Sequence, residues 1–484
     1  MKTTVIIGSG FSSLASACYM AKAGYRVTVL EKNEQLGGRA SMMEIDGYKF
    51  DMGPSWYWMP DIFERFFADF GKKVSDYYKL EKLSPAYRVV FGENDYIDIE
   101  DTPDKIIETF ERTEPGSGKY LKKFMDEAQG NYRIAMQDLV YNPGLSLLEL
   151  VSVESAKRLN LFVKNISEQV RKEIKNPKLR SILEFPVLFL GAKPNKTPAF
   201  YNFMNHADFG LGTWYPKGGF NAVALGMVKL AKELGVEFHV NEEVVGIDYE
   251  NNQAKKIRTQ NGVYEADVFI SGADYAHTEK LLNGNRNYSE EYWQKKTFAP
   301  SSFLYYVAFN RKVNHLLHHN LFFDTDFEAH AKEIYDTKEL PKQPLFYANF
   351  SSKTDDSLCE EGKEVGFFLI PVAVDLEDNE EIHEKYFQLI LDRIKKCTGE
   401  DLSDAIVFKK SFGVKDFKER YHSCRGNAYG LANTLLQTSV LRPTIKNKKL
   451  KNFFYTGQLT VPGPGVPPAL ISGKVVTDYI LKNN

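Results

Sequence analysis

The feature that most constrains the fold is a strand–turn–helix–strand pattern at the start of the chain. An apolar, β-prone run ending at Ile7 enters the turn Gly8-Ser9-Gly10, a helix of small residues follows over about 12–23, and a second strand over 25–30 leads to Glu31. The glycines let a pyrophosphate approach the backbone at the positive end of a helix, and the acid stands where a ribose hydroxyl would lie. This pattern predicts dinucleotide binding.

A second glycine motif comes just after Glu31 and distinguishes between kinds of dinucleotide. In Gly37-Gly38-Arg39 the backbone can pass close to a phosphate with a guanidinium beside it. Gly-Arg after the ribose acid is the pattern of flavoproteins that bind FAD in an extended form, rather than of NAD dehydrogenases. Ser13 replaces the third fingerprint glycine and is small enough for close helix–strand packing. The chain has one Gly-x-Gly fingerprint, so a second site for NAD is not predicted.

Strand signals farther along divide the chain into alternating segments. A hairpin pattern over 87–99 and strands over 298–412 indicate a second sheet, whereas strand–turn patterns return at 266–274 and 452–457. At 484 residues the chain is too long for one simple core. We expect an α/β fold: a discontinuous Rossmann-like FAD-binding domain with an inserted mixed β-sheet and a helical substrate- and membrane-binding domain. The predicted segments are 1–83, 213–290 and 416–484 for FAD binding, and 84–212 and 291–415 for the substrate domain.

Composition and residue spacing argue against several other functions. The formal net charge of -2 gives no overall field for nucleic acid. The four cysteines form no Cys-x-x-Cys pair, which predicts neither a zinc site nor a disulfide framework and fits a reducing cytoplasm. His315, His318 and His319 lie in a polar loop without a carboxylate framework, so we predict no metal. Met1-Lys2 runs directly into the first strand and no apolar run approaches about 18 residues, so we expect neither a signal peptide nor a membrane span.

Two stretches suggest contact with an apolar partner. Trp56-Tyr57-Trp58 follows a Gly-Pro-Ser turn beside the predicted flavin, and either packs in the core or lines an apolar substrate channel. The stretch 139–191 is rich in Leu, Val and Phe, and between Lys157 and Arg180 it carries eight basic residues against two acidic ones. This stretch is either a basic amphipathic helix in a membrane interface or a solvated helix that covers a core.

The C-terminal segment is a second anchor for the predicted flavin. The stiff loop Pro462-Gly463-Pro464-Gly465-Val466-Pro467-Pro468 joins a buried strand to a helix expected over 469–481. Two glycines leave the backbone free to press on a flat ligand, and the positive end of the helix would stabilise negative charge on reduced flavin. We therefore expect this loop against the isoalloxazine, with the helix start at the pyrimidine side.

Together these motifs resemble the bacterial phytoene desaturase family of carotenoid-pathway flavoenzymes. The resemblance covers essentially the whole chain. Besides the three N-terminal motifs it rests on Asp51-Met52-Gly53-Pro54-Ser55, Tyr215-Pro216-Lys217-Gly218-Gly219, Ser271-Gly272-Ala273-Asp274, Tyr455-Thr456-Gly457 and Gly465-Val466-Pro467. The run Trp56–Pro60 is most similar to enzymes of marine-type bacteria. Family members often have Gly-Ala/Thr-His-Pro-Gly where this chain has Gly457-Gln458-Leu459-Thr460-Val461-Pro462-Gly463, and this departure leaves the exact carotenoid open.

The resemblance implies FAD-dependent introduction of double bonds into phytoene, giving lycopene in several rounds by hydride transfer to flavin. Because a polyene delocalises the developing charge, a strong protein base is less necessary, and we name no catalytic residue. The resemblance also implies a carotenoid substrate and peripheral attachment to the inner face of the cell membrane, and electrons are expected to leave for a quinone or oxygen. The predicted cofactor-binding residues are Gly8, Ser9, Gly10, Phe11, Ser12, Glu31, Lys32, Gly38, Arg39, Gly53, Pro54, Ser55, Val244, Gly272, Asp274, Gly457, Gln458, Gly465, Val466 and Pro467.

Three alternatives stay open from the sequence. One is a related desaturase of a hydroxylated carotenoid, or a carotenoid isomerase of the same build. Another is a flavin amine oxidase, which should have an aromatic pair near the C-terminal motif and often a cysteine for covalent flavin; the stretch 455–468 has no cysteine. The third is a flavin-fold regulator that binds FAD without turnover.

Overall fold

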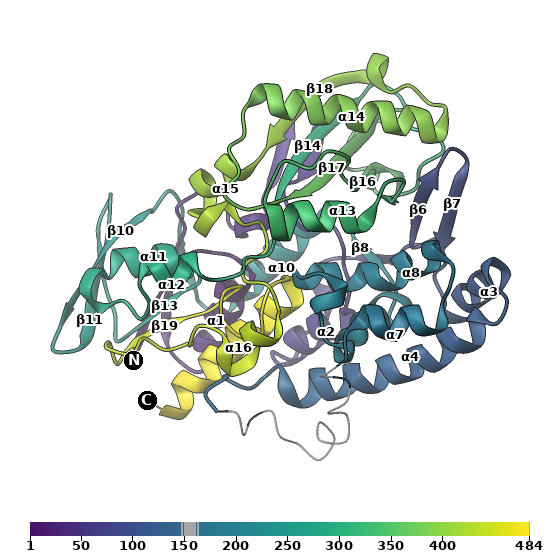
Figure 1. The fold of residues 1–484 in the computed structure, drawn as a ribbon. Helices are drawn as coiled ribbons and strands as arrows, with labels where there is room; N and C mark the ends of the chain where they lie inside the picture. Colours follow the sequence, from purple (N-terminus) through teal and green to yellow (C-terminus); the bar gives the residue numbers. More distant parts are fainter. Residues whose placement is uncertain (147–148, 150–160, 162–163, 484) are drawn as a thin grey trace.

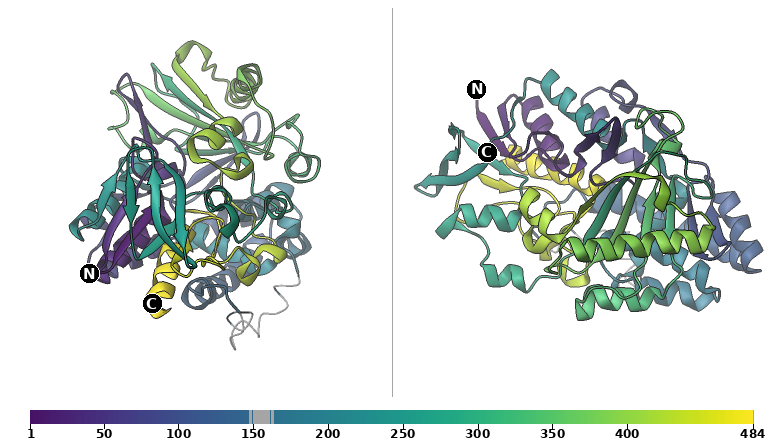
Figure 2. Two further views of the ribbon diagram at one scale, coloured as in Figure 1. Left: turned by 90° about the vertical axis from the view of Figure 1, so that its left-hand side faces the viewer. Right: turned by 90° about the horizontal axis from the view of Figure 1, so that it is seen from above.

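The first layer of the fold is a parallel sheet built from strands that lie far apart in the sequence. The computed structural model describes residues 1–146, 149, 161 and 164–483. Five strands pair in the order β19-β13-β1-β2-β9, and every pair is parallel. Their bounds are β1 (Thr3–Ile7), β2 (Arg26–Leu30), β9 (Glu237–His239), β13 (Val268–Ser271) and β19 (Phe453–Tyr455). Both termini lie beside this sheet (Figures 1 and 2).

Three helices accompany this sheet, and the first of them packs against the other two: α1 (Phe11–Lys22), α10 (Gly219–Glu233) and α16 (Val466–Asn483). The approach of α16 to α1 requires a glycine, because a Cβ on Gly473 would lie 2.5 Å from the carbonyl oxygen of Ser12. Ser13 is fully buried where a fingerprint glycine would stand, and its Oγ lies 2.0 Å from the place of a Cβ on Gly272. The small residue at 13 therefore packs as predicted.

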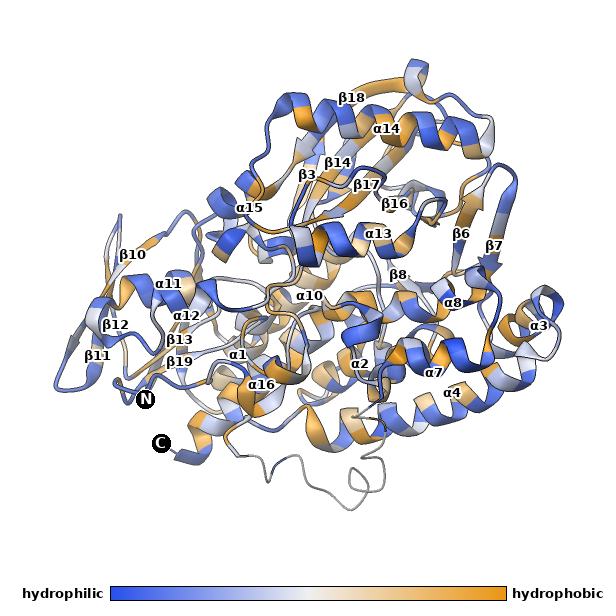
Figure 3. Ribbon diagram, viewed as in Figure 1, coloured by the Kyte–Doolittle hydropathy of each residue, from blue (hydrophilic) through white to orange (hydrophobic). Residues whose placement is uncertain are grey.

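The second layer is a seven-stranded mixed sheet in the order β18-β14-β17-β16-β15-β6-β7. The predicted hairpin forms its edge, and the long helix α14 covers one face over a second core of buried aromatic and aliphatic residues. In Figure 3 the central strands are mostly orange, and α14 shows both colours. The bounds are β6 (Tyr87–Gly92), β7 (Asp95–Ile99), β14 (Ser301–Phe309), β15 (His319–Phe322), β16 (Phe346–Asn349), β17 (Glu364–Val372), β18 (Ile406–Phe412) and α14 (Glu380–Thr398).

A helical region completes the molecule beside the seven-stranded sheet (Figure 1). Its helices are α2 (Pro60–Ala68), α3 (Pro103–Thr113), α4 (Ser117–Ile134), α7 (Ile166–Glu173), α8 (Pro177–Glu184) and α9 (Phe203–Asn205). Small sheets are formed by β3 (Met42–Ile45) with β4 (Tyr48–Asp51), by β5 (Leu80–Lys82) with β8 (Trp214–Pro216), and by β10 (Val244–Glu250), β11 (Gln253–Thr259) and β12 (Val263–Glu265). The remaining helices are α11 (Tyr275–Leu281), α12 (Glu290–Gln294), α13 (Phe327–Lys332) and α15 (Val414–Tyr421).

The basic stretch expected at a membrane is only partly described. Lys157 and Arg158 lie outside the described residues. Arg171 is not a free surface charge, because its Nε lies 2.8 Å from Glu184 and its Nη2 lies 2.6 Å from Glu328. Lys172 is 80% exposed and has only a weak pair with its neighbour Glu173. None of the helices in the described part of the chain combines the length and apolar character that a bilayer crossing requires.

Two local expectations are corrected by the structure. The last helix begins at Val466 rather than near Ala469, so Pro467 and Pro468 fall within its first turn, where a missing N–H costs nothing. The histidines at 318 and 319 are buried rather than in a polar loop, and His319 opens strand β15. Only His315 of this group is exposed.

Candidate functional site

A cavity of about 490 Å³ lies where the parallel sheet, the seven-stranded sheet and the helical region meet. One end is formed by loops at the carboxyl ends of β1, β2, β13 and β19, where open α/β sheets bind their ligands. The other end is formed by apolar side chains from the second sheet and the helical region. Every residue that we predicted to bind the cofactor lines this cavity. Their individual contacts with FAD stay predictions.

The start of α1 forms a backbone cradle at the nucleotide end. Gly10 precedes the helix with φ of -68° and ψ of 173°, and no side chain caps the first N–H groups. A Cβ on Gly10 would find no protein atom within 4 Å. The open space above this residue therefore belongs to the cavity, and the free N–H groups at the helix start suit a diphosphate.

Glu31 is buried at the end of β2, 4% exposed, and its carboxylate is held by neighbouring residues. One oxygen accepts hydrogen bonds from the N–H and Oγ of Ser9, at 2.9 and 2.6 Å. The other accepts two at 2.9 Å, from the N–H and the side-chain amide of Asn33. The carboxylate of Glu31 therefore holds the turn 8–10 in place. A ribose hydroxyl would donate a further hydrogen bond to a carboxylate that Ser9 and Asn33 already hold.

Arg39 brings a positive charge to the cavity; the residue is half-buried, and its guanidinium Nε is buried. Its Nη2 donates to Ser423 Oγ at 2.6 Å, and the guanidinium lies 5.1 Å from the centre of the Tyr421 ring. With its amide oxygen turned toward Arg39, Gln458 accepts from both Nη atoms at 3.1 and 3.2 Å. The Nε has no hydrogen-bond partner, and among the described residues no carboxylate forms an ion pair with Arg39. Burial lowers the pKa of this side chain, so the site suits an anionic ligand.

Other predicted residues at this end are engaged within the protein. Asp274 caps α11 through His277 N–H at 3.2 Å and also accepts from Cys424 N–H at 3.0 Å. Lys32 Nζ donates to the carbonyl of Glu419 at 2.6 Å. In the C-terminal loop Gly463 and Gly465 have φ of 138° and 110°, which favours glycine at both positions. Lys32, Asp274 and Gly465 line the cavity, whereas Gly463 faces the side chain of Asn433, whose Oδ1 lies 2.8 Å from the place of a Cβ.

The other half of the cavity is strongly apolar. Trp56 and Trp58 line it, whereas Tyr57 does not, because its hydroxyl is buried against Tyr78 at 2.7 Å. Tyr57 therefore packs in the core, whereas Trp56 and Trp58 face the cavity; that this half of the cavity is a substrate channel stays a prediction. The remaining apolar wall consists of Phe185, Leu188, Leu190, Met204, Leu304, Leu321, Phe323, Phe327, Ala331, Ile334, Leu345, Phe346 and Leu369.

Among the described residues that line the apolar half of the cavity, His330 is the one histidine. Both of its ring nitrogens make hydrogen bonds. Nε2 lies 2.9 Å from the carbonyl oxygen of Pro371, and Nδ1 accepts from Leu345 N–H at 3.0 Å. Burial lowers its pKa to about 4. A neutral ring held by two backbone groups is not free to act as a base on a substrate.

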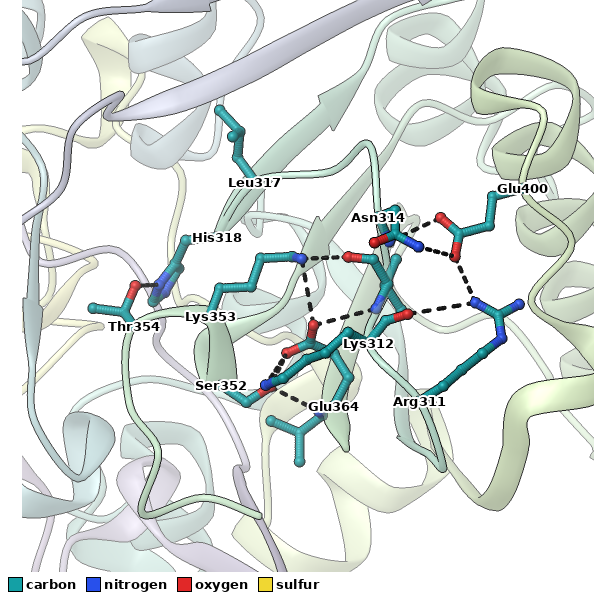
Figure 4. Close-up of polar contacts among 12 residues, drawn as sticks. Arg311, Lys312, Asn314, Leu317, His318, Ser352, Lys353, Thr354, Glu364 and Glu400 are labelled. Atoms are coloured by element: carbon teal, nitrogen blue, oxygen red, sulfur yellow. Dashed lines mark hydrogen bonds and ion pairs between the residues drawn. The ribbon is translucent and has the colours of Figure 1, made fainter. Parts of the chain in front are cut away.

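His318 makes a polar contact with Thr354, beside a separate polar network around Glu364 (Figure 4). His318 Nδ1 lies 2.7 Å from Thr354 Oγ1. Nearby, the fully buried Glu364 bonds Ser352 and lies 3.3 Å from Lys353 Nζ. No three potential ligands gather with metal-like geometry in the part of the chain that the structure describes.

Comparison with known proteins identifies the family. Residues 11–481 match the family model described as flavin containing amine oxidoreductase. A carotenoid 3,4-desaturase of Haloarcula japonica is 42% identical over 99% of this chain and 98% of its own length. A zeta-carotene-forming phytoene desaturase of Myxococcus xanthus is 30% identical over 99% of this chain and 93% of its own. The chain belongs to the flavin-containing amine oxidoreductases, and among them to the carotenoid desaturases.

This carotenoid desaturase is an FAD-dependent oxidoreductase, as the sequence predicted. An oxidoreductase of Methanosarcina mazei has the same fold, with a TM-score of 0.62 and 17% identity over 99% of this chain and 100% of the other. The residues present fit the cofactor, because the cradle above Gly10 is open and Arg39 has a buried, unused donor. FAD supplies the site with a hydride acceptor.

Sequence reasoning missed the wall contributed by residues 417–429. Ser423 bonds Arg39, the ring of His422 stacks on His277 at 4.0 Å, and Tyr429 reaches the apolar half of the cavity. This stretch has no recognisable motif. A weak signal was present in Gly426 and Gly430, two glycines close together in a polar loop; both have positive φ.

Proposed function

We propose that this carotenoid desaturase introduces double bonds into a long polyene, and that phytoene is converted to lycopene in several rounds. The observation that carries the proposal is the long apolar wall continuous with the nucleotide end of the same cavity. A hydrocarbon substrate offers no groups for hydrogen bonding, so shape and exclusion of water must position it. The relatives named for carotenoid desaturation support the substrate class.

The protein's own residues position the substrate and exclude water from it. Trp56 and Trp58 form a rigid aromatic edge, with ring centroids 5.5 Å apart. The carboxylates that line the described cavity, Glu31, Glu242, Glu243 and Asp274, all lie at the nucleotide end. An amine substrate would find no carboxylate in the apolar half of the described cavity, which favours a polyene over an amine.

A second candidate activity has specific support. The 42% identical relative is named a carotenoid 3,4-desaturase, whereas the relative that acts on phytoene is 30% identical. Desaturation at the 3,4 position of an already conjugated polyene is therefore the alternative. This reaction would use the same flavin and the same cavity. A different part of the polyene would lie beside the flavin.

Product analysis in a carotenoid-free host distinguishes the two activities. With phytoene supplied by a synthase, we expect products with a longer chromophore, ending at lycopene. With lycopene supplied instead, a product of still longer wavelength would indicate 3,4-desaturation and would contradict the phytoene assignment if phytoene stays unconverted. A Gly10→Val variant in the same host serves as the control without flavin. Failure of both substrates would contradict the proposed function as a whole.

We further propose that the protein works as a peripheral protein on the inner face of the cell membrane, with a quinone or oxygen as the final electron acceptor. A lipid-soluble substrate has to be collected from a membrane. Leu145, Leu436 and Leu441 are 50%, 79% and 46% exposed. Gly144 and Ser439 lie side by side, since a Cβ on the glycine would be 3.4 Å from the serine carbonyl. The leucines therefore flank one place on the surface.

Replacing Leu145 and Leu436 with serine should weaken binding to anionic vesicles about tenfold or more, since burying one such side chain is worth on the order of 1–2 kcal/mol. Sedimentation with vesicles measures this. Leu225, which is 50% exposed on α10, provides the matched Leu225→Ser control. Lys157→Glu with Arg158→Glu tests the basic contribution, which should disappear in salt. Unchanged sedimentation of the leucine variant would contradict this docking surface.

A further inference from the structure

A second, small cavity of about 20 Å³ adjoins the main one. Its polar lining comes from Asp51, Ser55, Tyr215, Asn349 and Ser351. This volume accommodates one water molecule, and the lining offers more than the two to four polar partners that a buried water needs. Ser55 is the one residue of the described lining that the two cavities share. The Ser55 hydroxyl is therefore a place where a proton could pass from one cavity to the other.

Asp51 is the carboxylate on the far side of this small cavity. Its two oxygens accept from the N–H groups of Phe220 and Asn221, at 2.8 and 3.1 Å, at the start of α10. The residue is half-buried, and a Cβ on Gly219 would lie 2.0 Å from its Oδ2. Burial, opposed by these two hydrogen bonds, raises the pKa of Asp51 to about 7. At neutral pH this carboxylate is poised between holding and releasing a proton.

Several titratable groups on neighbouring elements surround Asp51. Asp355 raises its pKa further, and itself accepts from Gly218 N–H at 2.6 Å. The negative charge of Asp51 contributes to raising the pKa of three tyrosines, Tyr215, Tyr306 and Tyr347. Beyond Asp355 lie His318, whose pKa burial lowers to about 3, and Lys217, which pairs with Glu81 at 2.9 Å. Asp51 therefore has a raised pKa without a basic partner in direct contact among the described residues.

Tyr347 holds the shared serine from the side of the main cavity. It lines that cavity, and its hydroxyl lies 2.6 Å from His319 Nδ1. Hydrogen bonds from Ser55 and Asn349 oppose the effect of burial, which raises the pKa of Tyr347. The His319 ring in turn stacks on Trp56 at 4.3 Å. The serine hydroxyl is thus fixed by a packed aromatic group at the cavity wall.

We propose that Ser55, a water in the small cavity and Asp51 form the path by which the proton lost from the substrate leaves the active site. This inference rests on the proposed desaturation. One C–H bond would break with its electron pair leaving as hydride, for which FAD bound in the cavity would be the acceptor and oxidant. The neighbouring C–H bond breaks with its electron pair forming the new C=C bond, and its proton goes to Ser55 Oγ as the serine's own proton moves through the water to the Asp51 carboxylate.

The test is anaerobic reduction of the FAD-loaded protein by phytoene or lycopene in vesicles, followed at the flavin band between pH 5.5 and 8.5. Because deprotonated Asp51 is the acceptor, the parent rate should rise with pH through about 7. Ser55→Ala and Asp51→Asn should each slow reduction about 100-fold and remove this pH dependence. Ser55→Thr should regain most of the rate. Asp355→Asn removes the charge that raises the Asp51 pKa, so the midpoint should move to lower pH.

A second measurement does not depend on turnover. Infrared difference spectra of the purified protein between pH 5 and 9 should contain a carboxyl band that is lost in Asp51→Asn and kept in Ser55→Ala. Absence of that band, or Ser55→Ala reducing at the parent rate with the parent pH profile, overturns the relay. Because Ser55→Ala does not touch α10, it decides the question even if Asp51→Asn folds poorly. Failure of every carotenoid to react would instead count against the proposed function, and the infrared titration would still judge Asp51.

Discussion

Gly10→Val should give a folded protein that does not retain FAD. The backbone at Gly10 is in an ordinary extended conformation, φ -68° and ψ 173°, which valine adopts readily. A Cβ there would meet no protein atom within 4 Å, so the apoprotein has room for the side chain. That room is the space above the first N–H groups of α1, where a diphosphate would lie. Overlap of this kind costs about 2–3 kcal/mol or more, which corresponds to a loss of affinity of about 100-fold.

The measurement is flavin absorbance per protein after purification, together with a melting curve without added FAD. Gly284→Val is the matched control, because Gly284 is exposed, is not in a positive-φ conformation and also has no atom within 4 Å of a Cβ. This control should stay yellow. The apoprotein of Gly10→Val should melt within a few degrees of the parent apoprotein. Full flavin absorbance in Gly10→Val would mean that the diphosphate lies elsewhere.

The nucleotide end of the cavity was predictable because its determinants are local. The turn 8–10 and Glu31 are read from one βαβ unit, and parallel strands bring their carboxyl ends to one edge of a sheet. Residues 272–274 and 457–458 were predicted from the same kind of strand–turn pattern. They converge on this edge because β13 and β19 extend the sheet that β1 begins.

The apolar half was not predictable residue by residue. Its lining comes from β14 to β17, from 185–190 and from α13, and which side chains face the cavity depends on how these elements pack. Leu321 and Phe322 are neighbours in β15, yet Leu321 faces the cavity while Phe322 packs into the core beneath α14. Strand alternation predicts that the two face opposite ways, but not which way.

The buried histidine at 319 illustrates a different limit. A stretch with three histidines is polar by composition, so a loop was expected. In the structure one ring nitrogen finds partners within the sheet, since Tyr347 and Asn349 lie 2.6 and 3.1 Å from His319 Nδ1, while Nε2 is buried without a hydrogen-bond partner among the described residues. Burial of such a residue depends on partners almost thirty positions away in the chain, which no local pattern contains.

Arg39→Met should weaken FAD binding strongly without lowering the stability of the apoprotein. The guanidinium Nε is buried, and the group has only neutral partners among the described residues, with Ser423 Oγ at 2.6 Å and the Gln458 amide. A buried charge without an ionic partner costs stability, so removing it at similar volume should leave the apoprotein melting temperature equal or higher. Hydrogen bonds from a charged donor to a diphosphate are worth about 1.5–3 kcal/mol, or about 10- to 100-fold in affinity.

Weaker FAD binding together with an equal or higher apoprotein melting temperature would identify Arg39 as a cofactor contact rather than a structural residue. Arg442 is more deeply buried than Arg39, being 4% exposed, and it donates to carbonyl oxygens of Thr460, Gln437 and Gln458 at 2.7, 3.0 and 2.9 Å. Arg442→Met should therefore lower the apoprotein melting temperature sharply, because those carbonyls lose their donors. Titration with FAD, followed by flavin fluorescence and by melting, gives both quantities for each variant. An Arg39→Met apoprotein as unstable as Arg442→Met, with FAD affinity unchanged, would make Arg39 a structural residue and would leave the diphosphate without its predicted cation.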